Sequence, residues 1–163
     1  MRRVEKEVKG REGIEAILLK CRTCHLGMAD GGAPYVVPLS FGYRFTEDDK
    51  LELFFHSARE GKKLDILRKN SKVCFEISDE GKFENAQSPC EMGYFYSSVI
   101  GFGEAVFLNE SADKCTDLAT IVKHQTGRDM LFTDMQTEAV CIFKVVSTDY
   151  SGKQRQECET KDG

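Results

Sequence analysis

Residues 51–63 read LELFFHSAREGKK, and this stretch decides much of the fold. Its first six residues are rich in strand-forming side chains, so they predict a β-strand over Leu51–His56. Ser57 and Glu60 stand three positions apart, in the pattern of a helix capping box. The stretch therefore predicts a strand that passes directly into a helix, with Ser57 as its N-cap and its end near Asn70.

Periodicity and turn signals extend this strand–helix pattern in both directions. Towards the N-terminus we expect a helix over Glu12–Cys21, then strands over Cys24–Asp30 and Tyr35–Phe45. Towards the C-terminus we expect a strand over Val73–Ser78, a long loop over Asp79–Met92, a bent β segment over Tyr94–Leu108, a helix from Ser111 to Gly127, an irregular segment over Met130–Thr137 and a last strand over Ala139–Tyr150. Strands joined by tight turns pair antiparallel, and about six of them tend to curl into a small barrel.

The bulk properties describe a single domain, over residues 1–153, followed by a flexible polar tail over 154–163. The chain has 163 residues and a formal net charge of −4, and this charge argues against a nucleic-acid partner. Its charged N-terminus lacks the apolar core of a signal peptide, and no stretch approaches the roughly 20 apolar residues of a membrane span. We therefore expect a cytoplasmic protein with no membrane partner.

Basic residues gather where the helix after residue 57 begins. Lys62 and Lys63 follow Gly61, which removes a side chain where a ligand could approach. The start of a helix attracts anions, whereas lysines in a first turn oppose the helix dipole. A bound phosphate would explain that cost, and a capped helix with solvated lysines is the alternative. His56 adjoins this place and is the more informative histidine, since His124 at the end of a helix is expected to be a protonated surface residue.

Seven cysteines are spread irregularly through the chain, at positions 21, 24, 74, 90, 115, 141 and 158. An odd number in a reducing compartment predicts free thiols. Residues 21–25 read CRTCH and match the haem-attachment pattern, but that chemistry goes with export and the chain has no export signal. A thiol-redox pair would follow a strand and open a helix, the reverse of the order expected here, and a structural zinc site would need further ligands. We therefore expect no metal site.

Several segments together resemble the nitroimidazole-resistance reductases of the pyridoxamine 5′-phosphate oxidase-like superfamily. The matching segments are PYVVPLSFGY at 34–43, LFFHSA at 53–58, GKK at 61–63, LRKN at 67–70 before the strand VCFE, and SVIG at 98–101 with Gly103. Their order and combination span the chain from about Cys24 to Lys153. Pro38 interrupts the first of these segments. A proline cannot donate to a strand ladder, so this position taken alone is an edge, a bulge or a ligand-facing position.

The resemblance implies a mainly β fold with peripheral helices, namely a six-stranded antiparallel split β-barrel. It also implies a homodimer that binds FMN at the subunit interface. The residues implied to line the isoalloxazine are Val36, Val37, Pro38, Leu39 and Ser40. Those implied on the ribityl-phosphate side are His56, Ser57, Gly61, Lys62 and Lys63. Tyr96, Ser97 and Ser98 are implied as further contacts from a neighbouring strand.

The function implied is an FMN-dependent oxidoreductase that reduces a small acceptor such as a nitroaromatic, with NAD(P)H as one candidate electron donor. His56 is the candidate catalytic residue, able to orient or protonate a ligand. One alternative is a flavin- or haem-binding barrel without catalysis. Another is pyridoxamine 5′-phosphate oxidase activity, against which Ser40 replaces a basic residue of those enzymes. A third is thiol-redox or metal chemistry at Cys21 and Cys24.

Overall fold

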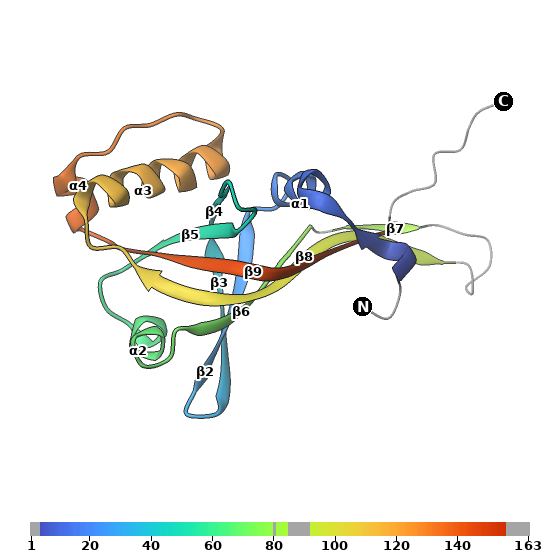
Figure 1. Cartoon of the computed structure of the whole chain (residues 1–163), viewed down its shortest axis with the longest axis horizontal. Helices are drawn as coiled ribbons and strands as arrows, with labels where there is room; N and C mark the ends of the chain where they lie inside the picture. Colours follow the sequence, from blue (N-terminus) through green and yellow to red (C-terminus); the bar gives the residue numbers. More distant parts are fainter. Residues whose placement is uncertain (1–3, 80, 85–91, 156–163) are drawn as a thin grey trace.

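The computed structural model describes residues 4–79, 81–84 and 92–155 (Figure 1). The helical elements are η1 (Val4–Lys6), α1 (Gly10–Leu18), α2 (Lys62–Lys69), α3 (Ser111–Thr126) and α4 (Asp134–Glu138). The strands are β1 (Glu7–Val8), β2 (Thr23–Asp30), β3 (Ala33–Ser40), β4 (Gly42–Phe45), β5 (Leu51–Ser57), β6 (Lys72–Ser78), β7 (Lys82–Glu84), β8 (Gly93–Phe107) and β9 (Cys141–Arg155). No helix of these described residues is long and apolar enough to cross a membrane.

All strand pairings in the described residues are antiparallel, and the hydrogen-bonded order is β3-β2-β6-β8-β9-β5-β4. Six strands have seven or more residues, and the other three, β1, β4 and β7, have four or fewer. The order begins at β3 and ends at β4, so the curled sheet stays open between those strands. The predicted fold class, a mainly β, antiparallel split barrel with peripheral helices, is confirmed.

The main core lies on the inner side of the curled sheet. In β2, the side chains of Cys24, Leu26 and Met28 are buried and alternate with more exposed neighbours, as the period of a strand requires. The rings of Phe55 and Phe143 stack across paired strands with centroids 5.2 Å apart. Helices α1 and α2 add their apolar faces, which comprise Ile14, Ile17, Leu18, Leu64, Ile66 and Leu67.

A second, smaller cluster lies on the outer side of the sheet. Phe54 and Ile142 point away from the main core and pack against Leu118 and Ile121 of α3. Helix α3 therefore covers the outer side of β4, β5 and β9 (Figure 1). This covering buries all four side chains to 8% exposure or less.

The outer side of β3, β2, β6 and β8 keeps apolar side chains in contact with solvent. Gly27 pairs with both Val36 and Cys74, and Cys74 pairs with Phe102, so these residues share one face of the sheet. Val36, Ile100 and Phe102 are 59%, 46% and 57% exposed. We call the surface formed by Val36, Cys74, Ile100 and Phe102 the bare face.

Buried charges connect three strands and α3. Glu52 of β5 is 6% exposed and accepts hydrogen bonds from Lys144 (2.6 Å) and Arg44 (2.5 Å). Burial alone would raise the pKa of Glu52, but these two cations outweigh it and hold the pKa below its usual range. Arg44 also lies 3.7 Å from Asp117, which is 4% exposed and whose pKa burial raises to about 6.

The helix start predicted at Ser57 is wrong. Ser57 ends β5, paired with Cys141, and its hydroxyl donates to the carbonyl of Ala58 (2.9 Å). Helix α2 begins at Lys62, with Gly61 as N-cap at φ +141°. The ladder with β9 holds Ser57 in an extended conformation, so the strand outcompetes the local capping pattern.

Other element boundaries also differ from the predictions. Helix α1 ends at Leu18, before Cys21, and the strand expected over 35–45 breaks at Phe41, whose ring is fully buried. The loop expected over 79–92 contains β7, paired with β8, while residues 80 and 85–91 lie outside the described residues. Helix α4 lies in the segment expected to be irregular. Strand β9 runs to Arg155, two residues beyond the predicted domain end, and 156–163 lie outside the described residues.

Candidate functional site

The β3 residues predicted to line a flavin divide between two faces. Val36, Pro38 and Ser40 are exposed on the outer side, whereas Val37 and Leu39 are half-buried and pack against the main core. A planar ligand on the outer surface can therefore touch the first three side chains directly. The alternation of a strand turns the other two away.

The two lysines at the start of α2 contact different groups. Lys62 places Nζ 3.3 Å from an Asp30 carboxylate oxygen and 4.8 Å from the ring centroid of Tyr35. Lys63 forms no hydrogen bond or ion pair within the described residues, and its charge acts on the thiol of Cys141. The predicted pair therefore consists of one lysine tied to the β2–β3 hairpin and one with its ammonium group unpaired.

Further cations gather near Lys63 at the rim of the barrel. Arg59, Arg68 and Lys114 line a cavity of about 340 Å³ beside Cys141, between α2 and the ends of β8 and β9. No carboxylate among the described residues lines it. Burial raises the pKa of the Cys141 thiol, while the charges of Arg68, Lys114 and Lys63 oppose that rise. We call Arg59, Lys63, Arg68 and Lys114 the rim cluster. Sequence analysis singled out only Lys63: Arg59 and Arg68 are near it in the chain but were not assigned a role, and Lys114 is 51 residues away.

The two residues at the end of β5 differ in how available they are to a ligand. His56 is exposed and forms no hydrogen bond within the described residues, so both ring nitrogens are free to bind. Ser57 is 8% exposed and donates its hydroxyl to its own neighbouring carbonyl. A ligand phosphate must displace that hydrogen bond to use the Ser57 hydroxyl.

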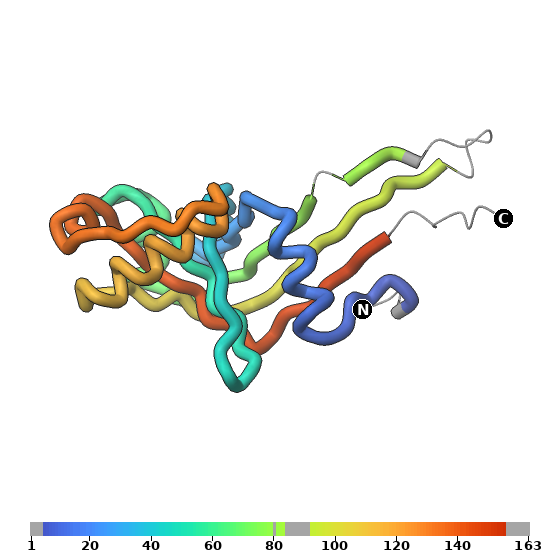
Figure 2. The backbone as a smooth tube through the Cα atoms, turned by 90° about the horizontal axis from the view of Figure 1, so that it is seen from above, coloured from blue at the N-terminus to red at the C-terminus, as the bar shows by residue number. Residues whose placement is uncertain are grey.

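Tyr96, Ser97 and Ser98 lie at the far end of the β8–β9 ribbon, which extends beyond the barrel (Figure 2). Ser97 is fully buried, and Asp79 accepts hydrogen bonds from its hydroxyl (2.5 Å) and its backbone N–H (3.2 Å). Tyr96 is eleven positions from Phe107, whose ring lies 5.6 Å from the guanidinium carbon of Arg68. At about 3.3 Å per residue, these positions are about 35 Å apart along the strand. One protomer therefore does not bring Tyr96–Ser98 to the start of α2.

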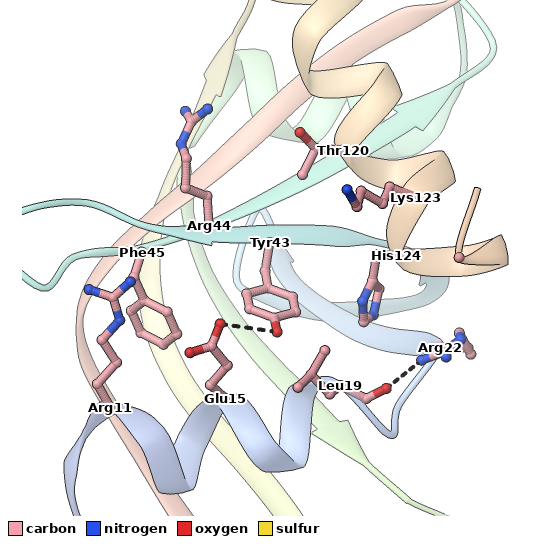
Figure 3. Close-up of a pocket in the computed structure, with 11 residues that line it drawn as sticks. Arg11, Glu15, Leu19, Arg22, Tyr43, Arg44, Phe45, Thr120, Lys123 and His124 are labelled. Carbon is pink, nitrogen blue, oxygen red and sulfur yellow. Dashed lines mark hydrogen bonds between the residues drawn. The ribbon is translucent and has the colours of Figure 1, made fainter. Parts of the chain in front are cut away.

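A second pocket, of about 570 Å³, lies between α1, β4 and α3 (Figure 3). The Tyr43 hydroxyl donates to Glu15 over 3.4 Å, and burial together with this carboxylate raises the pKa of Tyr43 to about 12. The His124 ring lies 4.7 Å from the ring of Phe41 and edge-on to Tyr43 at 5.2 Å. We call this the side pocket. Its walls come from three elements far apart in the sequence, so no local pattern predicted it.

His124 differs from the protonated surface residue that was predicted. It is half-buried, and burial lowers its pKa, so the imidazole is neutral at pH 7. Its Nε2 donates to the carbonyl of Cys21 (2.9 Å), which fixes the tautomer because a carbonyl can only accept. Packing against Phe41 and Tyr43 removes water from the imidazole, and this lowers its pKa more than the helix C-terminus raises it.

The Cys21–His25 segment carries no accessible thiolate. Cys21 and Cys24 are 2% and 0% exposed free thiols, and burial raises the pKa of Cys21 to about 11 and that of Cys24 still further. His25 is held by Glu76 at 2.9 Å. In the described part of the chain, no three His, Cys, Asp or Glu side chains are grouped as metal ligands would be.

Comparison with solved structures places this fold among known proteins. The chain is similar to a protein from Bacteroides thetaiotaomicron assigned provisionally to 5-nitroimidazole antibiotic resistance, with 29% identity and a TM-score of 0.78 over 91% of this chain and 86% of that one. It shares its fold with a flavocytochrome from Azotobacter vinelandii (22% identity, TM-score 0.71, covering 91% and 68%). It also shares it with an FAD- and haem-binding protein from Mycobacterium smegmatis (18%, 0.77, covering 93% and 74%).

The sequence itself gives the family. A search of curated proteins finds no match. The sequence profile described as pyridoxamine 5′-phosphate oxidase matches residues 10–154, which include every strand of the sheet except β1 and the last residue of β9. The chain therefore belongs to the pyridoxamine 5′-phosphate oxidase family.

Proposed function

We propose that this protein binds FMN between two copies of the chain and uses it to reduce a small acceptor, such as a nitroaromatic compound. Family membership supports flavin binding, and the Bacteroides relative supports the acceptor class. The observation on which the proposal rests most is the unpaired positive charge of Lys63 at the start of α2, beside the exposed strand β3.

The start of α2 suits the phosphate of FMN. The first backbone N–H groups of a helix have no partner within the helix, and they attract an anion. Gly61, at the N-cap, has nothing within 4 Å of the position a Cβ would occupy, so the approach is open. The ammonium of Lys63 supplies charge, and Lys62 can exchange its exposed contact with Asp30 for a phosphate.

The bare face suits the flavin ring. Gly27 lies between Val36 and Cys74. Because it has no side chain, a flat ligand can lie close to the backbone there, beside Pro38. A second copy on this face would bury its exposed apolar side chains.

A bound flavin supplies the electron-transfer chemistry, and the protein supplies binding, orientation and protons. His56 is exposed at the end of β5 and makes no hydrogen bond within the described residues. It is therefore available to orient an acceptor or to donate a proton to it. Lys63 and the first turn of α2 would neutralise the phosphate and so fix the other end of the cofactor.

The test is cofactor identification followed by turnover. The purified protein is expected to show flavin absorbance and to release FMN by mass spectrometry. It should also oxidise NADH or NADPH only when a 5-nitroimidazole is present. Lys63→Ala should weaken FMN binding about tenfold, the loss expected for one charge-assisted phosphate contact. Lys50→Ala, at a lysine paired with Asp48 in a surface turn, is the matched control.

Two results would contradict the proposal in different ways. A colourless protein that takes up no FMN in a titration would remove flavin binding altogether. Tight FMN binding without turnover of nitro compounds, quinones or nicotinamides would instead leave a non-catalytic flavin carrier.

A further inference from the structure

The side pocket is separate from the proposed flavin site. Helices α1 and α3 lie on one side of the molecule, and α2 with the β2–β3 hairpin lies on the opposite side (Figure 1). None of the residues predicted to bind flavin lines the side pocket. Its volume of about 570 Å³ is in the range of small-molecule sites.

The walls of the side pocket are fixed in the protomer. A Cβ at Gly42 would lie 2.7 Å from the Cα of Ile121, so α3 packs directly on the backbone of β4. The side-chain amide of Gln125 donates to the carbonyls of Arg22 (2.9 Å) and Phe41 (2.8 Å). With the bond from His124 to Cys21, three hydrogen bonds join the end of α3 to the main chain across the pocket. A pocket held in this way needs little reorganisation to bind a ligand.

One wall of the side pocket is aromatic. Tyr43 and Phe45 project from alternate positions of β4, and the neutral imidazole of His124 meets the Tyr43 ring edge-on (Figure 3). Leu19 of α1 faces them and is 56% exposed although it is apolar. These side chains offer a planar aromatic ligand a surface on both of its sides.

Most charges around the side pocket are already paired. Arg11 pairs with Asp49 (3.6 Å), Lys123 pairs with Asp129 (2.7 Å), and Arg44 belongs to the buried charge cluster with Glu52. Glu15, the one carboxylate among the described residues that line the pocket, accepts the hydrogen bond of Tyr43.

Arg22 is the exception among these charges. It donates Nη1 to the carbonyls of Leu19 (2.7 Å) and Cys21 (3.0 Å), and no ion pair with a carboxylate is found for it in the described residues. Its remaining N–H groups can bind an anion in a forked geometry.

We propose that the side pocket binds a small aromatic carboxylate, with its ring against Tyr43 and His124 and its carboxylate at Arg22. This assignment does not depend on the proposed flavin site, because it uses other residues on another side of the molecule.

The test uses 2-naphthoate as the probe, titrated calorimetrically into the protein as purified. We expect a dissociation constant below about 1 mM, and binding of the neutral 2-naphthamide weaker by about tenfold or more, as expected for one charge-assisted contact. Thr120→Glu, which adds a negative charge to the wall, should weaken naphthoate binding by about tenfold or more. Arg22→Gln should weaken naphthoate binding but not amide binding.

Two controls keep the outcome specific. Thr148→Glu places the same charge on an exposed position of β9 and should leave naphthoate binding unchanged. Lys63→Ala should also leave it unchanged, which separates this site from the flavin site. Thermal unfolding of each variant shows that it is folded. Equal affinity for carboxylate and amide, unchanged affinity in Thr120→Glu, or no binding at all would overturn the proposal.

Discussion

The two halves of the outer sheet surface are similar in composition but differ in what covers them. On β5 and β9, Phe54 and Ile142 point outward and are sealed by α3, with at most 1% of their surface exposed. On β3 and β8, Val36 and Phe102 also point outward, yet more than half of each remains exposed. One half is thus buried under a helix of the same protomer, and we call it the covered half. The bare face is instead an exposed apolar surface of the kind that marks an interaction site.

This difference bears on where a ligand can be held. Next to the covered half, α3 forms the side pocket with α1 and β4, and hydrogen bonds within one chain hold its walls. On the bare face, Val36, Ile100 and Phe102 remain 46–59% exposed, so a ligand there would be covered on one side only. The side pocket is therefore formed within one protomer, whereas the proposed flavin site depends on a second copy.

The largest effect should come from separating α3 from the covered half. Gly42→Ala places a Cβ against the backbone of Ile121, which a helix cannot accommodate without moving. We expect a loss of about 3 kcal/mol in unfolding free energy, measured by urea titration. Gly31→Ala is the control: Gly31 has φ +58° and open space around it, so only the backbone cost of about 1 kcal/mol should appear. Equal losses in the two variants would mean that α3 is not held by this contact.

The next effect concerns the bare face. Ile100→Lys and Phe102→Lys together should weaken self-association about 100-fold, because two buried charges would replace apolar contacts. Analytical ultracentrifugation across a range of concentrations measures this change. Leu131→Lys, at a residue that is 97% exposed and far from the bare face, should leave the mass unchanged. A protein that is monomeric before any substitution would contradict the two-copy site.

A smaller change in unfolding free energy should follow the charge state of Asp117, a buried residue of α3. Burial raises its pKa to about 6 in the folded state, so the folded protein holds this proton more tightly than the unfolded chain. The contribution of this bound proton to the unfolding free energy is complete below about pH 4, near the pKa of the unfolded chain. It is lost as the pH rises through 6.

Asp117→Asn removes this titration. Its unfolding free energy should exceed that of the original protein by about 2 kcal/mol at pH 8. The difference should shrink towards pH 4, as followed by urea unfolding at several pH values. Asp149→Asn, at an exposed position of β9 and not among the groups that act on the pKa of Asp117, should leave the pH profile unchanged.

Most of the longer strands were predictable because they show alternation or are rich in strand-forming residues, as in β5, where five consecutive residues are buried. Cys24, Leu26 and Met28 give the buried face of β2 directly, and the bend predicted within 94–108 corresponds to an irregular register between Phe102 and Glu104. The helix start at Ser57 was not predictable, because pairing with Cys141 decides it from 84 residues away.

The candidate site was predictable only in part, for the same reason. The adjacent residues Lys62 and Lys63 look like a pair in the sequence, but the turn of the helix sends them to different neighbours. Folding adds Lys114 of α3 to the three basic residues of the rim cluster within 59–68, and it brings together the three elements of the side pocket. Local sequence patterns therefore identified one basic residue of the rim cluster and no residue of the side pocket.

The buried carboxylate of Glu52 has a consequence for how the chain reaches this fold. A slip of β5 by one residue against β9 would turn Glu52 towards the phenylalanine-lined interior and move it away from Lys144. Such a misaligned sheet would hold a buried carboxylate without its cations, which costs free energy that the native register does not pay. A single acidic residue among apolar neighbours thus favours the native register of β5 against β9.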